Sequence, residues 1–145
     1  MKLGSELVPT VVTHDITVDN IVYQVTTESN STITDLRFIK EDKKLLINVT
    51  GPADTSGFCN ITIPNQLLGG PFNVTFDEHP MNEITTFDNG THTWLRLAYL
   101  NTEHKIEITG TIAIPEFPLT MLLPLLALTT LVAAVLAGRS KKSAR

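Results

Sequence analysis

Residues 89–111 read NGTHTWLRLAYLNTEHKIEITGT, and their side-chain pattern decides the fold. In 91–99, and again in 105–112, apolar residues recur at every second position with polar residues between them. Successive side chains of a strand point to opposite faces, so this period predicts two half-buried β-strands that pair as a hairpin. The Asn89-Gly90 dipeptide is the strongest short hairpin signal, and it predicts a two-residue turn into the first of these strands.

The same alternation recurs upstream, and no stretch between Val11 and Ile114 shows the 3.6-residue period of an amphipathic helix. Turn-forming Gly, Pro, Asn and Asp residues separate the alternating runs. We expect nine strands, at 16–18, 21–27, 32–39, 45–50, 58–63, 72–76, 83–87, 91–99 and 105–112. Seven to nine short strands in about 100 residues predict an all-β domain at 14–114, an immunoglobulin-like antiparallel β-sandwich.

Alternation also assigns each strand residue to the core or to the solvent. The predicted core residues are Ile21, Tyr23, Val25, Leu36, Phe38, Leu45, Ile47, Val49, Cys59, Ile61, Ile63, Phe72, Val74, Phe76, Leu95, Leu97, Tyr99, Ile106, Ile108 and Ile112. His92, Trp94 and Arg96 share the opposite phase, which predicts that they face outward together. The alternative is that a bulge flips the strand, or that a second sheet or loop covers the Trp94 ring. Cys59 is the sole cysteine, which excludes an internal disulfide and a cysteine-based zinc site.

The apolar excess of the chain is concentrated near its C-terminus. Residues 119–138 carry no charge, and 20 helical residues at about 1.5 Å each cover the roughly 30 Å hydrocarbon core of a bilayer. A buried core helix is the alternative, but such a helix usually carries a polar stripe. The segment predicts a transmembrane helix. The basic tail at 139–145 contains Arg139, Lys141, Lys142 and Arg145, which predicts a cytoplasmic C-terminus and an extracellular body.

The N-terminal segment, 1–13, has no apolar run long enough for a secretory signal peptide. Three interpretations remain open. The chain is the C-terminal part of a longer surface protein, its start is assigned too late, or it is a tail-anchored protein with a cytosolic body.

Charge and motifs exclude several functions. All 15 acidic residues but only 7 of the 11 basic ones lie within 1–116, which gives this part a net charge of −8 and argues against nucleic-acid binding. The chain contains no HExxH, P-loop, GxSxG or GxGxxG motif, so we expect no catalysis and no cofactor. His92 and His104 lie at the two ends of the expected hairpin and could approach each other, but a metal site there would need a third ligand, for example Glu103. Asp77-Glu78 is more typical of a turn than of a calcium site. We therefore expect no metal site.

Five N-x-S/T sequons occur, where about two are expected by chance from nine Asn and 27 Ser or Thr. A Thr-rich β protein also makes sequons by accident. The predicted strands nevertheless put three of the asparagines on the polar phase, and the other two lie in turns. We predict glycosylation at Asn30, Asn48, Asn60, Asn73 and Asn89, which would require an extracellular body.

Pro115-Glu116-Phe117, in the linker 115–118, precedes the apolar helix and the basic cluster. This order resembles the PEF-CTERM type of tripartite sorting signal in archaeal surface proteins, and the resemblance implies recognition by an archaeosortase-like membrane protease. Residues 50–68 and 89–111 resemble a β domain found just before such anchors. The resemblance implies a place in an archaeal cell envelope and no assigned activity.

The sequence therefore predicts a membrane-anchored, extracellular and non-catalytic structural or interaction module of an archaeal cell envelope. Its expected partners are the lipid bilayer, a sorting protease, and envelope proteins or glycans. One alternative is a surface adhesin or carbohydrate-binding module with His92, Trp94 and Arg96 on its binding platform. Another is an anchoring subunit of a larger envelope complex.

Overall fold

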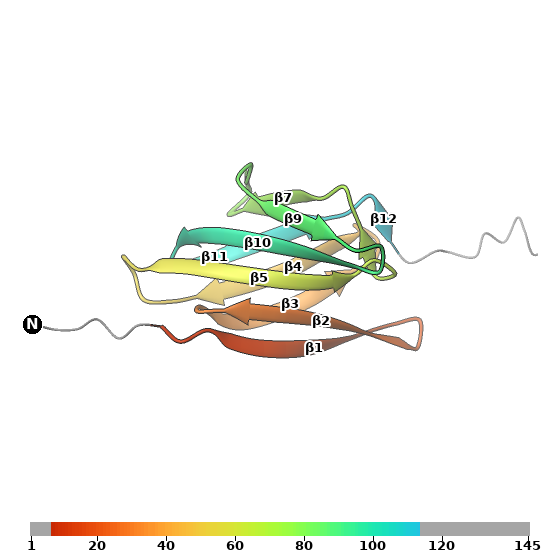
Figure 1. Cartoon of the computed structure of the whole chain (residues 1–145), viewed down its shortest axis with the longest axis horizontal. Coiled ribbons are helices and arrows are strands. Elements are labelled where there is room, and N and C mark those ends of the chain that lie inside the picture. Colours follow the sequence, from red (N-terminus) through yellow and green to blue (C-terminus); the bar gives the residue numbers. More distant parts are fainter. Residues whose placement is uncertain (1–6, 114–145) are drawn as a thin grey trace, which may run out of the picture. The chain divides into compact units, whose positions relative to one another are not determined.

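A computed structural model of the chain describes residues 7–113 (Figure 1). The twelve strands are β1 (Thr10–Val18), β2 (Ile21–Ser29), β3 (Thr32–Ile39), β4 (Lys44–Thr50), β5 (Ser56–Pro64), β6 (Leu68–Gly69), β7 (Asn73–Phe76), β8 (His79–Pro80), β9 (Thr85–Asp88), β10 (His92–Leu100), β11 (Glu103–Thr109) and β12 (Ile112–Ala113). Among residues 7–113 no helix is long and apolar enough to cross a membrane. The predicted sorting motif, transmembrane helix and basic tail lie outside the described residues.

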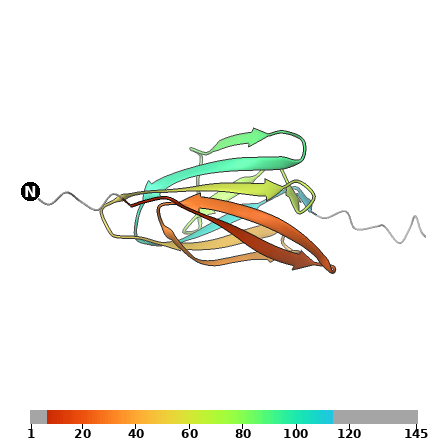
Figure 2. The same cartoon turned by 60° about the horizontal axis from the view of Figure 1, so that its bottom comes forward.

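Ten of the strands form two five-stranded antiparallel sheets, which confirms the predicted all-β fold. Sheet A has the order β1-β2-β5-β10-β9, and sheet B has the order β3-β4-β11-β7-β8. The two sheets pack face to face as a β-sandwich, and the short strands β12 and β6 form a separate pair (Figure 1). The long β1–β2 hairpin runs along one edge of sheet A (Figure 2).

The core lies between the sheets and is built from the inward phase of both. Its best-buried side chains come from the central strands of each sheet, for example Ile47 in β4, Ile61 in β5 and Leu97 in β10, all fully buried. Two core predictions are wrong. Ile21 follows the β1–β2 turn directly and is exposed, and Ile112 lies in β12 and is also exposed.

Several strand boundaries differ from the prediction. β1 begins at Thr10 instead of residue 16, because it pairs with β2 along its whole length. The prediction missed residues 10–15 because the consecutive Val11 and Val12 break the alternation. The last predicted strand ends at Thr109, and Gly110 separates it from β12. A Cβ at Gly110 would lie 2.6 Å from the carbonyl oxygen of Gly69, so only glycine fits at this close approach.

The predicted hairpin between residues 91–99 and 105–112 does not form. β10 pairs with β5 and β9 in sheet A, whereas β11 pairs with β4 and β7 in sheet B. Alternation does not distinguish the two arrangements, because each strand buries one face in either case. The connection between the two strands contains Asn101, whose side chain bonds to the two neighbouring connections at the same end of the sandwich.

Three connections between the sheets meet at one end of the sandwich: β2 to β3, β4 to β5 and β10 to β11. Asn101 lies among them and is fully buried. Its Oδ1 accepts a hydrogen bond of 2.6 Å from Ser31 Oγ, and its Nδ2 donates one of 2.9 Å to Thr55 Oγ1. Tyr99 donates its hydroxyl hydrogen to Ser31 Oγ at 2.9 Å. One asparagine thus links all three connections.

The neighbouring glycines make room for this network. A Cβ at Gly57 would collide with the side chains of Asn101 and Tyr99, and one at Gly51 would lie 2.7 Å from Asn101. Backbone atoms take part as well, because Asn101 N–H donates to the Thr55 carbonyl at 2.8 Å and Gly51 N–H donates to the Thr102 carbonyl at 3.1 Å. The end of the sandwich is therefore packed around a single polar side chain.

We predict that Asn101→Ala lowers the free energy of unfolding by about 2–4 kcal/mol, because the substitution removes the hydrogen-bond acceptor of the buried Ser31 hydroxyl and the donor to the half-buried Thr55 hydroxyl. Asn82→Ala is the matched control, since Asn82 is exposed between β8 and β9. Urea denaturation of the full chain measures both variants. Equal stability of the two would show that the network does not hold the crossovers together.

Candidate functional site

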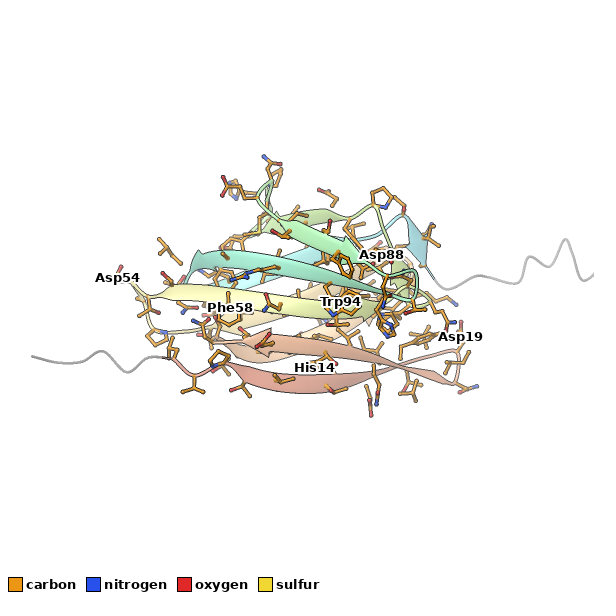
Figure 3. The ribbon with its side chains drawn as sticks, in the orientation of Figure 1. His14, Asp19, Asp54, Phe58, Asp88 and Trp94 are labelled. Atoms are coloured by element: carbon orange, nitrogen blue, oxygen red, sulfur yellow. The ribbon has the colours of Figure 1, made fainter. Side chains whose placement is uncertain are left out.

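The outer face of sheet A carries a groove of about 480 Å³ that runs across the strands from β1 to β9. Trp94 lies on this face (Figure 3). The lining residues are Val11, Thr26, Glu28, Asn60, Thr62, Thr85, Phe87, Trp94, Leu95 and Arg96. All but Leu95 belong to the outward phase of their strands, so the groove uses side chains that the core does not need.

Strand register arranges these side chains in two rows. Trp94 on β10 lies between Thr62 of β5 and Phe87 of β9. In the next outward row, Arg96 lies between Asn60 and Thr85. An aromatic row and a polar row therefore lie next to each other across the sheet.

The aromatic row is open to solvent. Phe87 is 64% exposed and Trp94 is 36% exposed, with ring centroids 5.4 Å apart and planes tilted by 38°. Trp94 thus lies outward, as alternation predicts. His92 lies at the edge of this pair, with its ring centroid 6.3 Å from that of Trp94, but it does not line the groove.

The polar row contains groups with unused hydrogen-bonding capacity. Within residues 7–113 the Arg96 guanidinium has no ion pair and no side-chain hydrogen bond. Asn60 Nδ2 donates to Glu28 Oε2 at 3.0 Å, while Asn60 Oδ1 is buried without a hydrogen-bond partner among the described residues. Glu28 lies opposite Asn60 in the pairing of β2 with β5.

Sequence reasoning found Trp94 and Arg96 but missed Phe87, Glu28 and the rest of the groove. Glu28 reaches the groove through the pairing of β2 with β5, which alternation does not predict. Phe87 was missed because of the loop at Asn89-Gly90. A two-residue turn would pair Trp94 with Thr85, whereas the observed loop pairs Trp94 with Phe87. Asn89 Oδ1 accepts hydrogen bonds from the backbone N–H groups of Thr91 and His92, at 3.0 and 2.9 Å, and this side-chain turn lengthens the loop.

The sequon asparagines lie in different environments. Asn73 and Asn89 are exposed, and Asn48 is half-buried on the outer phase of β4. Asn60 lies in the groove, so a glycan there would fill it. Asn30 is held by sheet A, because its Nδ2 donates to the Ser56 carbonyl at 2.8 Å and its Oδ1 accepts from Phe58 N–H at 2.8 Å. The five sequons are therefore not equally accessible.

Asp77, His104 and Thr102 form the cluster that most resembles catalytic machinery. His104 Nδ1 lies 2.6 Å from Asp77 Oδ2, and its Nε2 lies 2.8 Å from Thr102 Oγ1. However, Nε2 also lies 2.7 Å from the carbonyl oxygen of Leu100. Nε2 therefore has a backbone carbonyl as well as the Thr102 hydroxyl within hydrogen-bond distance, so its contact with Thr102 is not the exclusive pairing of a base with a nucleophile.

The Asp77 cluster instead closes the end of sheet B. Asp77 and Glu78 form the turn between β7 and β8 with positive φ angles of 49° and 69°, as expected for turn acids. His104 packs on Phe76, with ring centroids 4.3 Å apart. Across residues 7–113 no group of three or more His, Cys, Asp or Glu side chains is placed to hold a metal ion.

The remaining reactive groups are separated from the groove. β10 is nine residues long and His104 follows its far end, so His92 and His104 lie roughly 25 Å apart at about 3.3 Å per residue. Cys59 is fully buried, and burial raises the pKa of its thiol to about 12. Cys59 is therefore a core residue and remains protonated at neutral pH.

Comparison with protein-family models, with curated proteins and with solved structures returned no match. The groove on sheet A is therefore interpreted from its own chemistry.

We predict that Asp77→Asn lowers the free energy of unfolding by about 1 kcal/mol at pH 7, since solvent screens the half-exposed carboxylate. Partial burial raises the pKa of the Asp77 carboxyl, but hydrogen bonds from Lys105 N–H and His104 outweigh it, so the net pKa lies below the ordinary value. Because the pKa of Asp77 is lower in the folded state than in the unfolded state, its ionised carboxylate stabilises the fold above about pH 4. This stabilisation is lost as the pH falls through the folded-state pKa.

The difference between wild type and Asp77→Asn should therefore shrink as the pH falls below about 4 and passes through the lowered folded-state pKa, as the carboxyl protonates. Asp54→Asn is the matched control, because Asp54 also has a positive φ, 61°, and is exposed. Denaturation curves measured across this pH range provide the comparison. A difference that does not change with pH would contradict the role of the ionised carboxylate.

Proposed function

We propose that the protein is a non-catalytic interaction module that is anchored in a membrane and binds a partner on the outside of the cell. The observation that carries the proposal is the groove on sheet A, where Phe87 and Trp94 are exposed beside an Arg96 that has no partner among the described residues. Exposed aromatic side chains next to an unpaired arginine are characteristic of binding sites, because all of these groups gain contacts on association.

The anchor follows from the sequence outside the described residues. In this proposal residues 119–138 span the membrane, and Arg139, Lys141, Lys142 and Arg145 hold the C-terminus in the cytoplasm. The resemblance to PEF-CTERM surface proteins supports an archaeal envelope and a sorting protease that recognises Pro115-Glu116-Phe117. The sandwich at 14–114 then serves as an immunoglobulin-like domain on the cell surface.

Glycans fit this proposal at some sequons better than at others. Asn73 and Asn89 are exposed, and Asn89 uses only its Oδ1 in the hydrogen bonds of the loop, so its Nδ2 remains available for attachment. Asn30 uses both amide atoms to join β5, and Asn60 lies in the groove. Glycans at the accessible positions would leave the groove open.

We predict that Asn73 and Asn89 carry glycans and that Asn30 and Asn60 do not. Glycopeptide mass spectrometry on protein isolated from its own membrane fraction gives the occupancy of each site. Protease treatment of intact cells, which should digest the β domain and spare the C-terminal tail, gives the orientation. An unmodified chain whose β domain is protected in intact cells would contradict the extracellular proposal and favour the tail-anchored alternative.

We also predict that Trp94→Ala weakens binding of the full chain to isolated envelope material by about tenfold or more, because a central aromatic anchor typically contributes at least 1.4 kcal/mol. Leu100→Ala is the matched control. Leu100 is 71% exposed on the same phase of β10 and lies outside the groove. Equal loss in both variants, or loss accompanied by unfolding in circular dichroism, would contradict a specific role for Trp94.

A further inference from the structure

We propose that the groove on sheet A binds an uncharged saccharide, which stacks on Trp94 and Phe87 and hydrogen-bonds to Arg96 and Glu28. This inference rests on the proposed function and names the class of ligand for the same face. Four features of the groove carry it: its aromatic row, its balance of charge, its mixture of donors and acceptors, and the lack of free backbone groups in its floor.

The aromatic row provides a surface for the face of a sugar ring. A pyranose has C–H groups on its faces and hydroxyls around its edge, so it stacks on an exposed aromatic ring while its edge remains available for hydrogen bonds. Trp94 and Phe87 are neighbours on paired strands and both are exposed. The groove volume of about 480 Å³ falls within the range of roughly 300–1,000 Å³ for small-ligand sites.

The charge of the groove favours a neutral ligand. Among residues 7–113, Arg96 and Glu28 are the only charged residues that line the groove, and they carry opposite charges. A phosphate or carboxylate ligand would be attracted by Arg96 but repelled by Glu28. A cation would be attracted by Glu28 but repelled by Arg96. A neutral ligand has no such penalty.

The polar groups also match hydroxyls, which both donate and accept hydrogen bonds. Arg96 offers donors, Glu28 offers a carboxylate acceptor, and Thr62 and Thr85 offer hydroxyls that do either. Asn60 Oδ1 is an acceptor without a partner in the described part of the chain, and a small rotation of its side chain would present it to a ligand hydroxyl. A polyhydroxylated ligand uses all of these groups.

An extended peptide is a poorer fit. Peptides that bind sheets usually add a strand and depend on free backbone N–H and C=O groups. The floor of the groove is formed by β5 and β10, which are paired on both sides, β5 with β2 and β10, and β10 with β5 and β9. In the described part of the chain, the middle of the groove therefore offers no free strand edge.

The test uses the single tryptophan of the chain as its probe, since Trp94 is the only Trp and lies in the groove. The full chain, in a zwitterionic detergent without a sugar headgroup, is titrated with neutral oligomers of glucose, mannose, galactose and N-acetylglucosamine, and with uronic-acid oligomers. We expect a saturable change in Trp94 fluorescence with at least one neutral oligomer and weaker binding of the acidic ones.

Variants then assign the contacts. Arg96→Ala, Glu28→Gln and Phe87→Ala should each weaken binding of that oligomer about tenfold, and Leu100→Ala should leave it unchanged. The thermal unfolding midpoint of each variant should stay close to that of wild type, because all four side chains lie on the outer face. Loss of binding in Leu100→Ala as well would overturn the assignment to the groove.

Two further results would overturn the inference: no binding of any neutral oligomer, or tighter binding of the acidic ones. A glycan found on Asn60 would do the same, since the chain's own sugar would then occupy the groove. Failure of the inference is distinguishable from failure of the proposed function. If Trp94→Ala still weakens binding to envelope material while no oligosaccharide binds, the face is an interaction site for another class of partner.

Discussion

The fold depends on the buried hydrogen bonds of Asn101, which hold three sheet-to-sheet connections at one end of the sandwich. The chain leaves sheet A after β2, returns with β5, and leaves again after β10, so each of these connections passes through this end. Asn101 bonds to Ser31 in the first connection and to Thr55 in the second, and itself belongs to the third. The network joins the connections that follow or precede β2, β5 and β10, which are neighbours in sheet A although they are far apart in sequence.

This placement creates the binding face. Glu28, Asn60 and Arg96 come from three strands that are neighbours only because of the crossovers, and the pairing registers put them in one row. Their inward neighbours, such as Ile61 and Leu97, are fully buried and keep the strands rigid beneath the groove. The core therefore positions the outward side chains without using them, and they remain free to contact a ligand.

Alternation alone was sufficient to predict the all-β fold, most of the core and the outward position of Trp94, because burial on one face is a local property of each strand. It was not sufficient to predict that β10 and β11 belong to different sheets, since both arrangements bury Leu97 and Ile106 equally well. It also missed Phe87 as the neighbour of Trp94, because the side chain of Asn89 enlarges the loop and shifts the register by two residues. Pairing and register depend on side-chain hydrogen bonds that a hydrophobic pattern does not contain.

Ligand binding in the groove requires the outer face of sheet A to be open in the intact protein. Acrylamide quenching of Trp94 fluorescence in the full chain, without added ligand, tests this requirement most directly, because no other tryptophan contributes to the signal. With Trp94 36% exposed, we expect quenching well above that of a buried tryptophan, and the quenching should rise further in denaturant. Weak quenching with blue-shifted emission would show that another part of the chain or a second copy covers the face, and would contradict a free binding groove.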